Sequence, residues 1–454
     1  MRQLLILIQL CVSINVFAQV DTTTNLSDKE KIFGLSKFWS EAKYNFVYFD
    51  RTKINWDSAF AAFIPKVLTT KNTWDYYLVL KQFAALLKDG HTDIMEPGSL
   101  YNASRYKFSD IEWINDHFYI TNIDIRDRAK VPLGSEVLTV NDTPVINYVK
   151  NNIIPYISAS TQQQLRNEAS WQMFYGTDTS QKWRLKLITP HGKYITYDAY
   201  FHTYPRTWVK PLPDWKRTAF KKIDDIGYFQ INTFADTGII NDFKKILPQL
   251  RNCKGVILDI RNNGGGNSAI AAEILKYFTN EKTIVGSTWK TREDLGAFKA
   301  WGKFLTGNNT DSLSDFDKKC LLVYRGDYWY QGDTMEFENN IEESKILTPL
   351  IVLIGNNTAS AAEDFLIMLA GLKNRATTIG QLTFGSTGQP LIFDLPGGGS
   401  ARVCAKKDTY PNGKEFVGYG IKPDILVQQN INDIIEGKDT ELEAVIKEIK
   451  HEIK

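Results

Sequence analysis

The chain has few cysteines and almost no net charge. Its 454 residues include only 4 cysteines, and 54 Lys and Arg residues face 52 Asp and Glu residues. The cysteines beyond the N-terminal segment, Cys253, Cys320 and Cys404, show neither C-x-x-C nor metal-site spacing, so neither a disulfide framework nor a zinc site is indicated. We expect them to be small buried side chains. The balanced charge gives no field that would attract nucleic acid, so a nucleic-acid partner is not expected.

The apolar run near the N-terminus is too short to span a bilayer comfortably. Arg2 precedes the apolar residues 4–12, and a Val-Phe-Ala sequence precedes Gln19. This order is typical of a secretory signal peptide over residues 1–18, so we expect the mature chain to begin near Gln19. A buried N-terminal helix or a membrane anchor is the alternative. The signal peptide predicts a periplasmic or secreted protein without stable membrane insertion.

The first part of the mature chain has the apolar spacing of helices. Hydrophobic residues make up 43% of the sequence, which is typical of a globular protein. The pattern predicts a small helical domain over residues 19–105, with Ser27 and Thr73 as helix N-caps. Gly90 is expected to stop the last helix and to leave His91 on a loop.

Short alternating strands follow, and they predict a β domain over residues 106–205. The expected strands are 118–123, 137–140, 183–187 and 194–197. Residues 131–145 resemble the core of a PDZ domain, with Asn141-Asp142 as a tight turn between two strands. A PDZ-like module binds peptide ends by adding a strand to its sheet edge. Residues 153–181 exceed this pattern and predict an inserted helical hairpin.

Strands then alternate with helices, which predicts an open α/β sheet over residues 206–430 with its functional groups at the carboxyl ends of the strands. Strands are expected near residues 226, 256, 321, 351 and 377, and helices at 268–278 and after 360. Residues 431–454 are expected to pack on this domain as an amphipathic helix. Residues 288–335 are longer than a sheet connection needs and form a lid, a substrate platform or extra packing. The expected fold class is therefore α+β / α/β with several domains.

Two strand ends carry residues suited to acyl transfer. One apolar strand breaks at residues 355–358, and Ser360 then opens a helical run. A hydroxyl on such a turn lies among unsatisfied backbone N–H groups, which can hold the charge of an attacked carbonyl oxygen. A second strand, 255–260, runs into the glycines 264–266, where the backbone can approach a bound group closely. The alternative for these glycines is a tight turn without a ligand.

A serine nucleophile needs a base, and the chain contains 5 histidines. We expect surface or structural roles for those on turns, among aromatic residues or near the C-terminus. These are His117, His191, His202 and His451. His91 differs because it follows a glycine on a loop after a helix, but spacing alone leaves its role open.

Four motifs resemble, in the same order, those of the C-terminal processing (tail-specific) peptidase family. They are D-I-R-N-N-G-G-G at 259–266, N-T-A-S-A-A-E at 357–363, T-F-G-S-T-G-Q at 383–389 and G-Y-G-I-K-P-D at 418–424. The resemblance implies a PDZ-like domain joined to an α/β serine-hydrolase domain of ClpP/crotonase-like fold, which needs neither metal nor cofactor. It places the nucleophile on Ser360. The backbone N–H groups of Ala361 and of one of Gly264 or Gly265 are expected to form the oxyanion hole.

One departure from the family pattern concerns the general base. Typical members carry a lysine in a T-F-G-K-G motif, whereas this chain has Ser386 at the corresponding position. The F-G-S-T-G-Q-P-L form, together with the L-K-D-G-H-T motif at 87–92, resembles the branch related to the tricorn core protease. That branch uses a histidine assisted by a glutamate, and the match implies His91 as the base.

The acid that supports His91 is less closely defined by the resemblance. Glu415 is the best match to the supporting glutamate, although relatives often place the acid nearer to the G-x-G-I-x-P-D motif. Asp89 and Asp93, which flank His91, are competing candidates. Glu363 lies in the first turn of the nucleophile helix and is expected to complement the helix dipole.

These features predict a secreted serine endopeptidase that cleaves unfolded polypeptides or C-terminal tails through an acyl-enzyme on Ser360. The alternative on the same scaffold is a non-catalytic protein that binds peptides or apolar ligands, for which Trp215, Trp301 and Trp329 would suit a groove. A third class, an esterase or amidase for small molecules, shares the nucleophile but has no use for a peptide-reading module.

Overall fold

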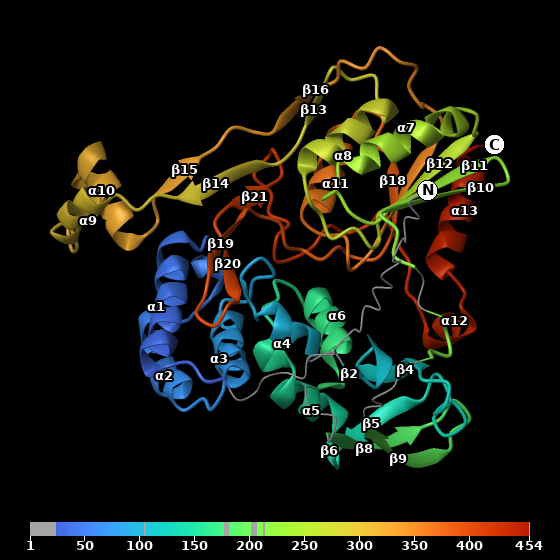
Figure 1. Ribbon diagram of the computed structural model, residues 1–454. Coiled ribbons are helices and arrows are strands. Elements are labelled where there is room, and N and C mark those ends of the chain that lie inside the picture. The colour runs from blue at the N-terminus through green and yellow to red at the C-terminus, as the bar shows by residue number, and fades with distance from the viewer. Residues whose placement is uncertain (1–23, 104–105, 177–180, 201–206, 212–213, 454) are drawn as a thin grey trace, which may run out of the picture.

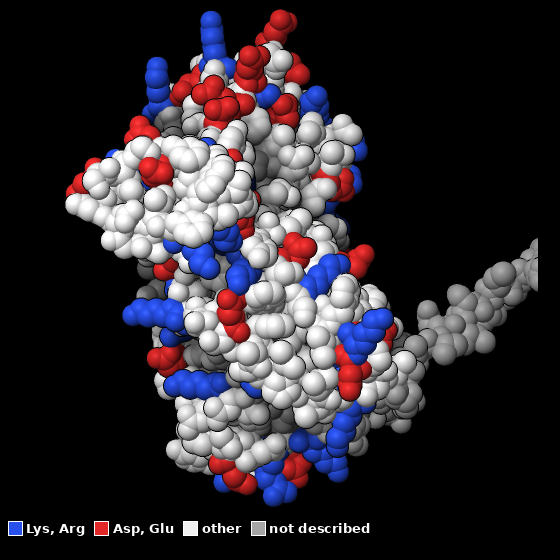
Figure 2. Space-filling view, turned by 90° about the vertical axis from the view of Figure 1, so that its left-hand side faces the viewer, with Lys and Arg blue, Asp and Glu red and all other residues white. Residues whose placement is uncertain are grey.

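The computed structural model describes residues 24–103, 106–176, 181–200, 207–211 and 214–453 (Figure 1). The predicted signal peptide and His202 lie outside the described residues. The described part combines a helical N-terminal region with several sheets, which confirms the predicted mixed, multidomain fold class. Positive and negative side chains are interspersed over the face drawn in Figure 2, in keeping with the balanced composition.

The N-terminal region packs helices around an aromatic core. Its elements are α1 (Asp28–Asn45), η1 (Phe49–Arg51), α2 (Trp56–Leu68) and α3 (Thr73–Ala85). Ser27 caps α1 in a capping box with Glu30, as predicted. The cap predicted at Thr73 was wrong by one residue. Asn72 caps α3 because its side-chain oxygen accepts from the Asp75 N–H group at 2.8 Å, and Thr73 is already helical.

Antiparallel strands in the order β3-β4-β5-β8-β9 form the β module, and β6 pairs with β5. Their bounds are Ser109–Ile114 (β3), His117–Ile123 (β4), Glu136–Val140 (β5), Thr143–Pro144 (β6), Lys182–Ile188 (β8) and Tyr194–Tyr200 (β9). The strands predicted in this region are confirmed. Asn141 and Asp142 have φ angles of 49° and 60°, as a tight hairpin turn requires.

The described part of residues 153–181 does not form the predicted helical hairpin. It holds the turn η2 (Ile154–Tyr156), one α-helix, α6 (Gln162–Gln172), and β7 (Tyr175–Gly176). Pro155 lies within the turn, where its missing N–H group disfavours a longer helix. A separate helix, α5 (Val145–Asn152), precedes the turn.

The α/β domain is built on a sheet of six strands in the order β10-β11-β12-β17-β18-β22. Their bounds are Thr218–Ile223 (β10), Ile226–Ile231 (β11), Gly255–Asp259 (β12), Leu350–Ile354 (β17), Thr377–Gly380 (β18) and Ile425–Leu426 (β22). All neighbouring pairs except β10 with β11 are parallel. The carboxyl ends of β12 and β17 therefore lie side by side, as the sequence predicts for the two motif-bearing strands.

Helices cover both faces of this sheet (Figure 1). One face packs against α7 (Gly238–Arg251), α8 (Ser268–Leu275) with η3 (Lys276–Phe278), and α11 (Ala361–Gly371). Val256 and Leu258 of β12 point to this layer, whereas Ile257 points to α13 (Thr440–Glu452) on the other face. The predicted C-terminal amphipathic helix is confirmed by α13, which follows the short α12 (Ile431–Glu436).

An arm projects from the sheet toward the N-terminal helices (Figure 1). It contains β13 (Thr283–Val285), β14 (Thr288–Arg292), α9 (Gly296–Lys303), η4 (Thr310–Ser312), α10 (Asp315–Arg325), β15 (Trp329–Gln331) and β16 (Glu336–Glu338). The strand predicted near Leu321 was wrong, because that residue lies in α10. Ser314 caps this helix at its start and Gly326 ends it in the left-handed conformation, and these end signals outweigh the short apolar run.

A small sheet joins the N-terminal region to the α/β domain. β1 (Asp93–Met95) pairs with β20 (Ser400–Cys404), which pairs in turn with β19 (Pro390–Asp394). The remaining short elements are α4 (Gly98–Ala103), β2 (Tyr106–Lys107) and β21 (Lys407–Thr409). The pairing of β1 with β20 brings the loop that ends at Thr92 against the α/β domain. Among the described residues, no helix has the length and apolar character that a membrane-spanning helix needs.

Candidate active site

Ser360 lies on a strained turn between β17 and α11. Its φ and ψ angles are 55° and −123°, a conformation that residues other than glycine rarely adopt. The carbonyl oxygen of Ser360 accepts hydrogen bonds from the N–H groups of Glu363 and Asp364 at 2.7 and 3.0 Å, so the helix begins directly behind the serine. The structure therefore places a hydroxyl at a sharp strand-to-helix turn, as the sequence predicts.

The glycine loop after β12 lies against this turn. The N–H group of Ala359 donates to the carbonyl oxygen of Asn263 at 3.0 Å, and the Thr358 hydroxyl donates to the carbonyl oxygen of Ile260 at 2.8 Å. Gly265 has a φ angle of 100°, and its α-carbon faces Ser360 so closely that a side chain would not fit. The two strand ends thus form one surface.

The three expected oxyanion donors differ in their hydrogen bonding. The N–H group of Gly265 donates to the side-chain oxygen of Asn263 at 2.9 Å and is therefore engaged within the loop. No hydrogen bond within the described part of the chain uses the N–H group of Gly264, an exposed residue. Ala361 is the first residue of α11, and the N–H group at this position has no partner inside a helix.

A buried loop after α3 holds His91. The Asp89 carboxylate fixes the loop by accepting from the N–H group of His91 at 3.2 Å and from the Thr92 hydroxyl at 2.7 Å. The Ser160 hydroxyl donates to the other Asp89 oxygen at 3.2 Å. The Thr92 hydroxyl also accepts from the N–H group of Cys404 in β20 at 2.9 Å, which ties the loop to the α/β domain.

Ser386 connects the histidine with the serine. Its Oγ atom lies 2.6 Å from Nδ1 of His91, although the two residues are 295 positions apart in the sequence. The carbonyl oxygen of Ser386 accepts from the N–H group of Ser360 at 3.2 Å. Sequence reasoning noted Ser386 only as the residue in place of a lysine and did not predict this contact, because nothing in the spacing pairs it with His91.

Burial and two nearby cations keep the His91 ring neutral. Burial, together with the positive charges of Arg402 and Lys406, lowers the pKa of His91 to about 3. Each cation has a carboxylate of its own, since Arg402 pairs with Asp93 at 2.9 Å and Lys406 pairs with Asp408 at 2.9 Å. A neutral imidazole has a lone pair that can accept a proton.

Glu363 is buried in the first turn of α11, and its carboxylate binds the 383–387 loop. Its carboxylate accepts from the N–H groups of Gly385 and Ser386 at 2.9 and 3.1 Å and from the Thr387 hydroxyl at 2.8 Å. The Thr383 hydroxyl also donates to it. Burial raises the pKa of Glu363 to about 7, although these hydrogen bonds favour the ionised form. The 383–387 loop is thereby fixed to the first turn of α11.

Glu415, the expected supporting acid, lies between two cations. It pairs with Lys407 at 2.9 Å and with Arg51 at 3.2 Å. Burial alone would raise the pKa of Glu415, but Lys407 and Arg51 outweigh this effect and lower it. No contact between Glu415 and His91 occurs among the described residues, so its supporting role stays a prediction. The competing Asp89 contacts the backbone of His91, and Asp93 contacts Arg402.

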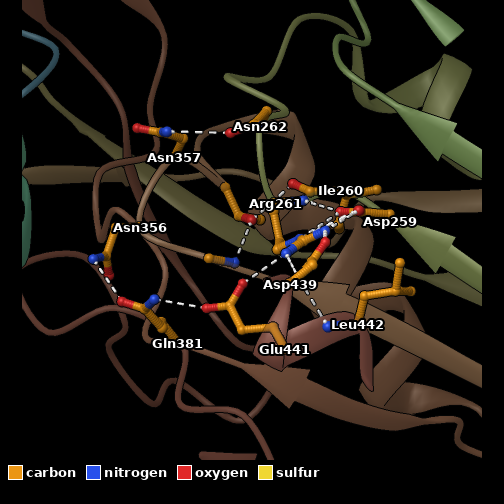
Figure 3. A network of polar contacts seen from close by, with 12 residues as sticks. Asp259, Ile260, Arg261, Asn262, Asn356, Asn357, Gln381, Asp439, Glu441 and Leu442 are labelled. Carbon is orange, nitrogen blue, oxygen red and sulfur yellow. Dashed lines mark hydrogen bonds and ion pairs between the residues drawn. The ribbon is translucent and has the colours of Figure 1, made fainter. Parts of the chain in front are cut away.

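Arg261 precedes the glycine loop and binds three carboxylates (Figure 3). Its guanidinium group binds Asp259 at 2.8 Å, Asp439 at 2.7 Å and Glu441 at 2.9 Å. Glu441 also accepts from the side chain of Gln381 at 2.6 Å. The network joins the end of β12 to α13.

The residues expected to be structural behave as such. Cys253, Cys320 and Cys404 are free and buried, which confirms the prediction. His117 is half-exposed at the start of β4 and lies 2.6 Å from Glu136. Within the described residues, no cluster of His, Cys, Asp or Glu side chains could hold a metal ion.

Comparison with known proteins identifies the domain that carries Ser360. The sequence profile of peptidase family S41 matches residues 225–427. A carboxy-terminal-processing protease of Bartonella bacilliformis is 27% identical over 242 residues, which are 52% of this chain and 46% of that protein. A carboxyl-terminal-processing protease of a Picosynechococcus species is 27% identical over 230 residues, 49% of this chain and 44% of that protein. The chain thus spans about half the length of these curated relatives.

The fold is also found among solved structures. The crystal structure of mature CPAF superimposes with a TM-score of 0.71 at 17% identity and covers 94% of this chain and 98% of its own. That likeness concerns the fold alone and extends over most of the chain. The glycine loop and Ser360 lie within the segment that matches the profile of peptidase family S41.

Proposed function

We propose that this protein is a serine-type peptidase in which Ser360 is the nucleophile and His91 the general base. The observation that carries the proposal is the position of Ser386, whose hydroxyl contacts His91 and whose carbonyl oxygen binds the backbone of Ser360. One residue in contact with both groups keeps the imidazole close to the nucleophile. The family match and the strained turn at Ser360 support the same assignment.

The reaction follows from the groups in the site. The Ser360 hydroxyl attacks the carbonyl carbon of a peptide bond and transfers its proton to the neutral ring of His91. The tetrahedral intermediate then breaks its C–N bond, and His91 returns the proton to the leaving amine. Water attacks the resulting ester of Ser360 with His91 again as the base, which releases the acid and restores the serine.

The oxyanion hole is proposed to consist of the N–H groups of Gly264 and Ala361. Both belong to the adjoining carboxyl ends of β12 and β17. Gly265 is the weaker candidate of the two glycines because its N–H group already donates to Asn263. Two such donors stabilise the negative oxygen of the tetrahedral intermediate, and loss of one donor typically costs about 3 kcal/mol in the activation barrier.

Polypeptides are the proposed substrates, and C-terminal tails are the first class to test. The two curated relatives described above are named for carboxy-terminal processing. Helix α6, which packs on β3 of the β module, contacts the 383–387 loop directly, because the hydroxyl of its N-cap Thr161 and the side chain of Gln163 donate to the carbonyl oxygens of Phe384 and Thr383 at 2.8 and 3.0 Å. A peptide held by a PDZ-like module would therefore lie beside the site. The signal-like N-terminus supports a periplasmic or extracellular location.

The decisive experiment is covalent labelling with a fluorophosphonate probe, followed by mass spectrometry of the labelled peptide. We expect label on Ser360, and we expect the Ser360→Ala variant to lose both the label and the hydrolysis of casein. His91→Gln should reduce casein hydrolysis by a factor of at least about 10², as loss of a general base requires. Ser312→Ala and His117→Gln are matched controls, because Ser312 is exposed and His117 is half-exposed.

Each outcome separates the candidate functions. Casein hydrolysis by Ser360→Ala would remove this serine from the mechanism. A folded wild-type protein that neither takes up the probe nor cleaves casein would favour the binding-protein alternative. Labelling of Ser360 without cleavage of any polypeptide, but with turnover of small esters, would support the esterase alternative.

A further inference from the structure

We infer that Ser386, held in place by Glu363, is the positioning residue that orients the His91 ring for proton transfer. This inference rests on the proposed function and adds the group that selects the ring's tautomer. The Ser386 hydroxyl is the side-chain partner of the His91 ring among the described hydrogen bonds, at 2.6 Å from Nδ1. Both side chains are buried, so water does not compete freely for this contact.

The direction of this hydrogen bond determines which ring nitrogen can act as the base. A neutral imidazole carries its proton on one nitrogen and a lone pair on the other. When Nδ1–H donates to the Ser386 oxygen, the lone pair is on Nε2, which can then accept the proton of Ser360. The opposite tautomer would leave Nε2 protonated and unable to act as a base. Ser386 thus orients the His91 ring as a buried carboxylate does in a Ser-His-Asp triad, but it does not supply the negative charge of that carboxylate.

Glu363 fixes the position of the Ser386 hydroxyl. The carboxylate accepts from the N–H groups of Gly385 and Ser386 and from the hydroxyls of Thr383 and Thr387. These donors leave the loop little freedom to rotate. Since Glu363 itself donates its N–H group to the carbonyl oxygen of Ser360 at 2.7 Å, the same helical turn holds the nucleophile and the loop that orients the base.

The other acidic groups in this region bind partners other than the His91 ring. Asp89 binds the backbone of its own loop, and Asp93 binds Arg402. Asp408 pairs with Lys406, and Glu415 lies between Lys407 and Arg51. Ser386 is therefore the side chain that remains to orient the ring.

The test measures the tautomer of His91 directly. Full-length protein with ¹⁵N-labelled histidine is prepared in the Ser360→Ala background, which prevents self-cleavage, and the His91 signals are assigned from a His91→Gln spectrum. We expect the Nδ1–H form in this background. Ser386→Ala and Ser386→Cys should both shift His91 toward the Nε2–H form, because neither side chain offers a good acceptor, whereas Ser386→Thr should keep the Nδ1–H form.

Kinetics on the Ser360-containing protein provide the second readout. Ser386→Ala is expected to lower kcat for casein about 10- to 100-fold with KM within about twofold, because substrate binding is untouched while the base is misoriented. Ser386→Thr should recover most of this loss. An unchanged tautomer in both Ser386→Ala and Ser386→Cys, or a kcat within about twofold of wild type, would overturn the inference.

Glu363 is tested against its neighbour Asp364. Both are buried carboxylates in the first turn of α11, but Asp364 binds the hydroxyls of Ser268 and Ser287, each at 2.6 Å, and does not contact the 383–387 loop. Glu363→Gln should shift the His91 tautomer, and Asp364→Asn should not. An equal shift in both would contradict the role of Glu363. The spectra need no activity, so this test can fail while the proposed peptidase function stands, and the labelling and casein experiments test that function separately.

Discussion

A side chain on Gly265 would collide with Ser360, because its Cβ atom would lie 2.6 Å from the Cβ atom of the serine. The same atom would lie 2.8 Å from the carbonyl oxygen of Ala359 and 3.0 Å from the nitrogen of Ala361. The φ angle of Gly265, 100°, is also one that residues with side chains rarely adopt. The glycine loop therefore packs closely against the turn that carries Ser360.

We expect Gly265→Ala to destabilise the protein by about 2 kcal/mol or more and to abolish hydrolysis of casein. The methyl group must push the Ser360 turn away from the loop. The free energy of unfolding in urea and the rate of casein hydrolysis check both effects. Gly264→Ala is the matched control for stability, since nothing lies within 4 Å of a Cβ atom at that position. Equal stability of the two variants would contradict the close approach.

Backbone strain at Ser360 leads to a second prediction. At its φ angle of 55°, alanine keeps the strain of the native residue, whereas glycine relieves it. Ser360→Gly should therefore be more stable than Ser360→Ala by about 1 kcal/mol, even though glycine gains more entropy on unfolding. Neither variant has the nucleophile, so both can be compared by urea unfolding without self-cleavage. A less stable glycine variant would show that the turn is not strained.

The pKa of His91 predicts how stability depends on pH. Burial and the cations Arg402 and Lys406 lower this pKa from 6.5 to about 3, so the unfolded chain binds a proton that the folded chain does not. The resulting stability is fully present above pH 6.5 and is lost as the pH falls toward 3. Between pH 7 and pH 5, the protein with His91 should lose about 2 kcal/mol of stability that the His91→Gln variant does not lose.

This prediction is checked by urea unfolding at both pH values in the Ser360→Ala background. The free energy of unfolding is measured with and without the additional His91→Gln substitution, so that all other titrating groups are the same in the two proteins. Parallel loss of stability in the two proteins would mean that His91 titrates alike in the folded and unfolded states. A titration of the His91 ring signals by NMR gives the folded-state pKa independently.

The strands and helices that carry the motifs could be predicted because local signals define them. An apolar strand followed by glycines, and another followed by Ser360 and a helical run, already indicate adjoining strand ends in an α/β sheet. α10 could not be predicted from its short apolar run, which is also typical of a strand. The cap residues Ser314 and Gly326 are the local signals that define this helix. The N-cap at Asn72 was missed because Thr73 is also a good capping residue.

The partners of His91 could not be predicted from spacing. His91 and Ser386 are far apart in the sequence and meet because β1 pairs with β20, which brings the histidine loop against the later part of the chain. Hydrogen bonds between side chains so distant in sequence leave no periodic signal. The partners of Glu363 could not be predicted either. Its position in the first turn of a helix predicts an interaction with the helix dipole, whereas the four groups that donate to its carboxylate come from the 383–387 loop.

The network around Arg261 gives the last prediction. Its guanidinium group binds Asp259, Asp439 and Glu441, and the side chains of Asp259 and Glu441 are only 1% and 3% exposed. Arg261→Met removes the cation and leaves these carboxylates buried without a counter-charge, which should cost about 3 kcal/mol of folding stability. Arg261→Lys should recover little of it, because an ammonium group cannot reproduce the planar fork that binds several carboxylates.

The exposed pair of Lys450 and Asp224 is the matched control on the same helix. Its atoms are also close, 2.7 Å apart, but the two side chains are 49% and 71% exposed. Lys450→Ala should therefore change the free energy of unfolding by less than about 1 kcal/mol. Amide hydrogen exchange adds a local readout, since Arg261→Met should speed exchange in α13 and in the glycine loop, which Arg261 joins, whereas Lys450→Ala should affect only the end of α13. Equal effects of the two variants would mean that the network behaves as an ordinary surface ion pair.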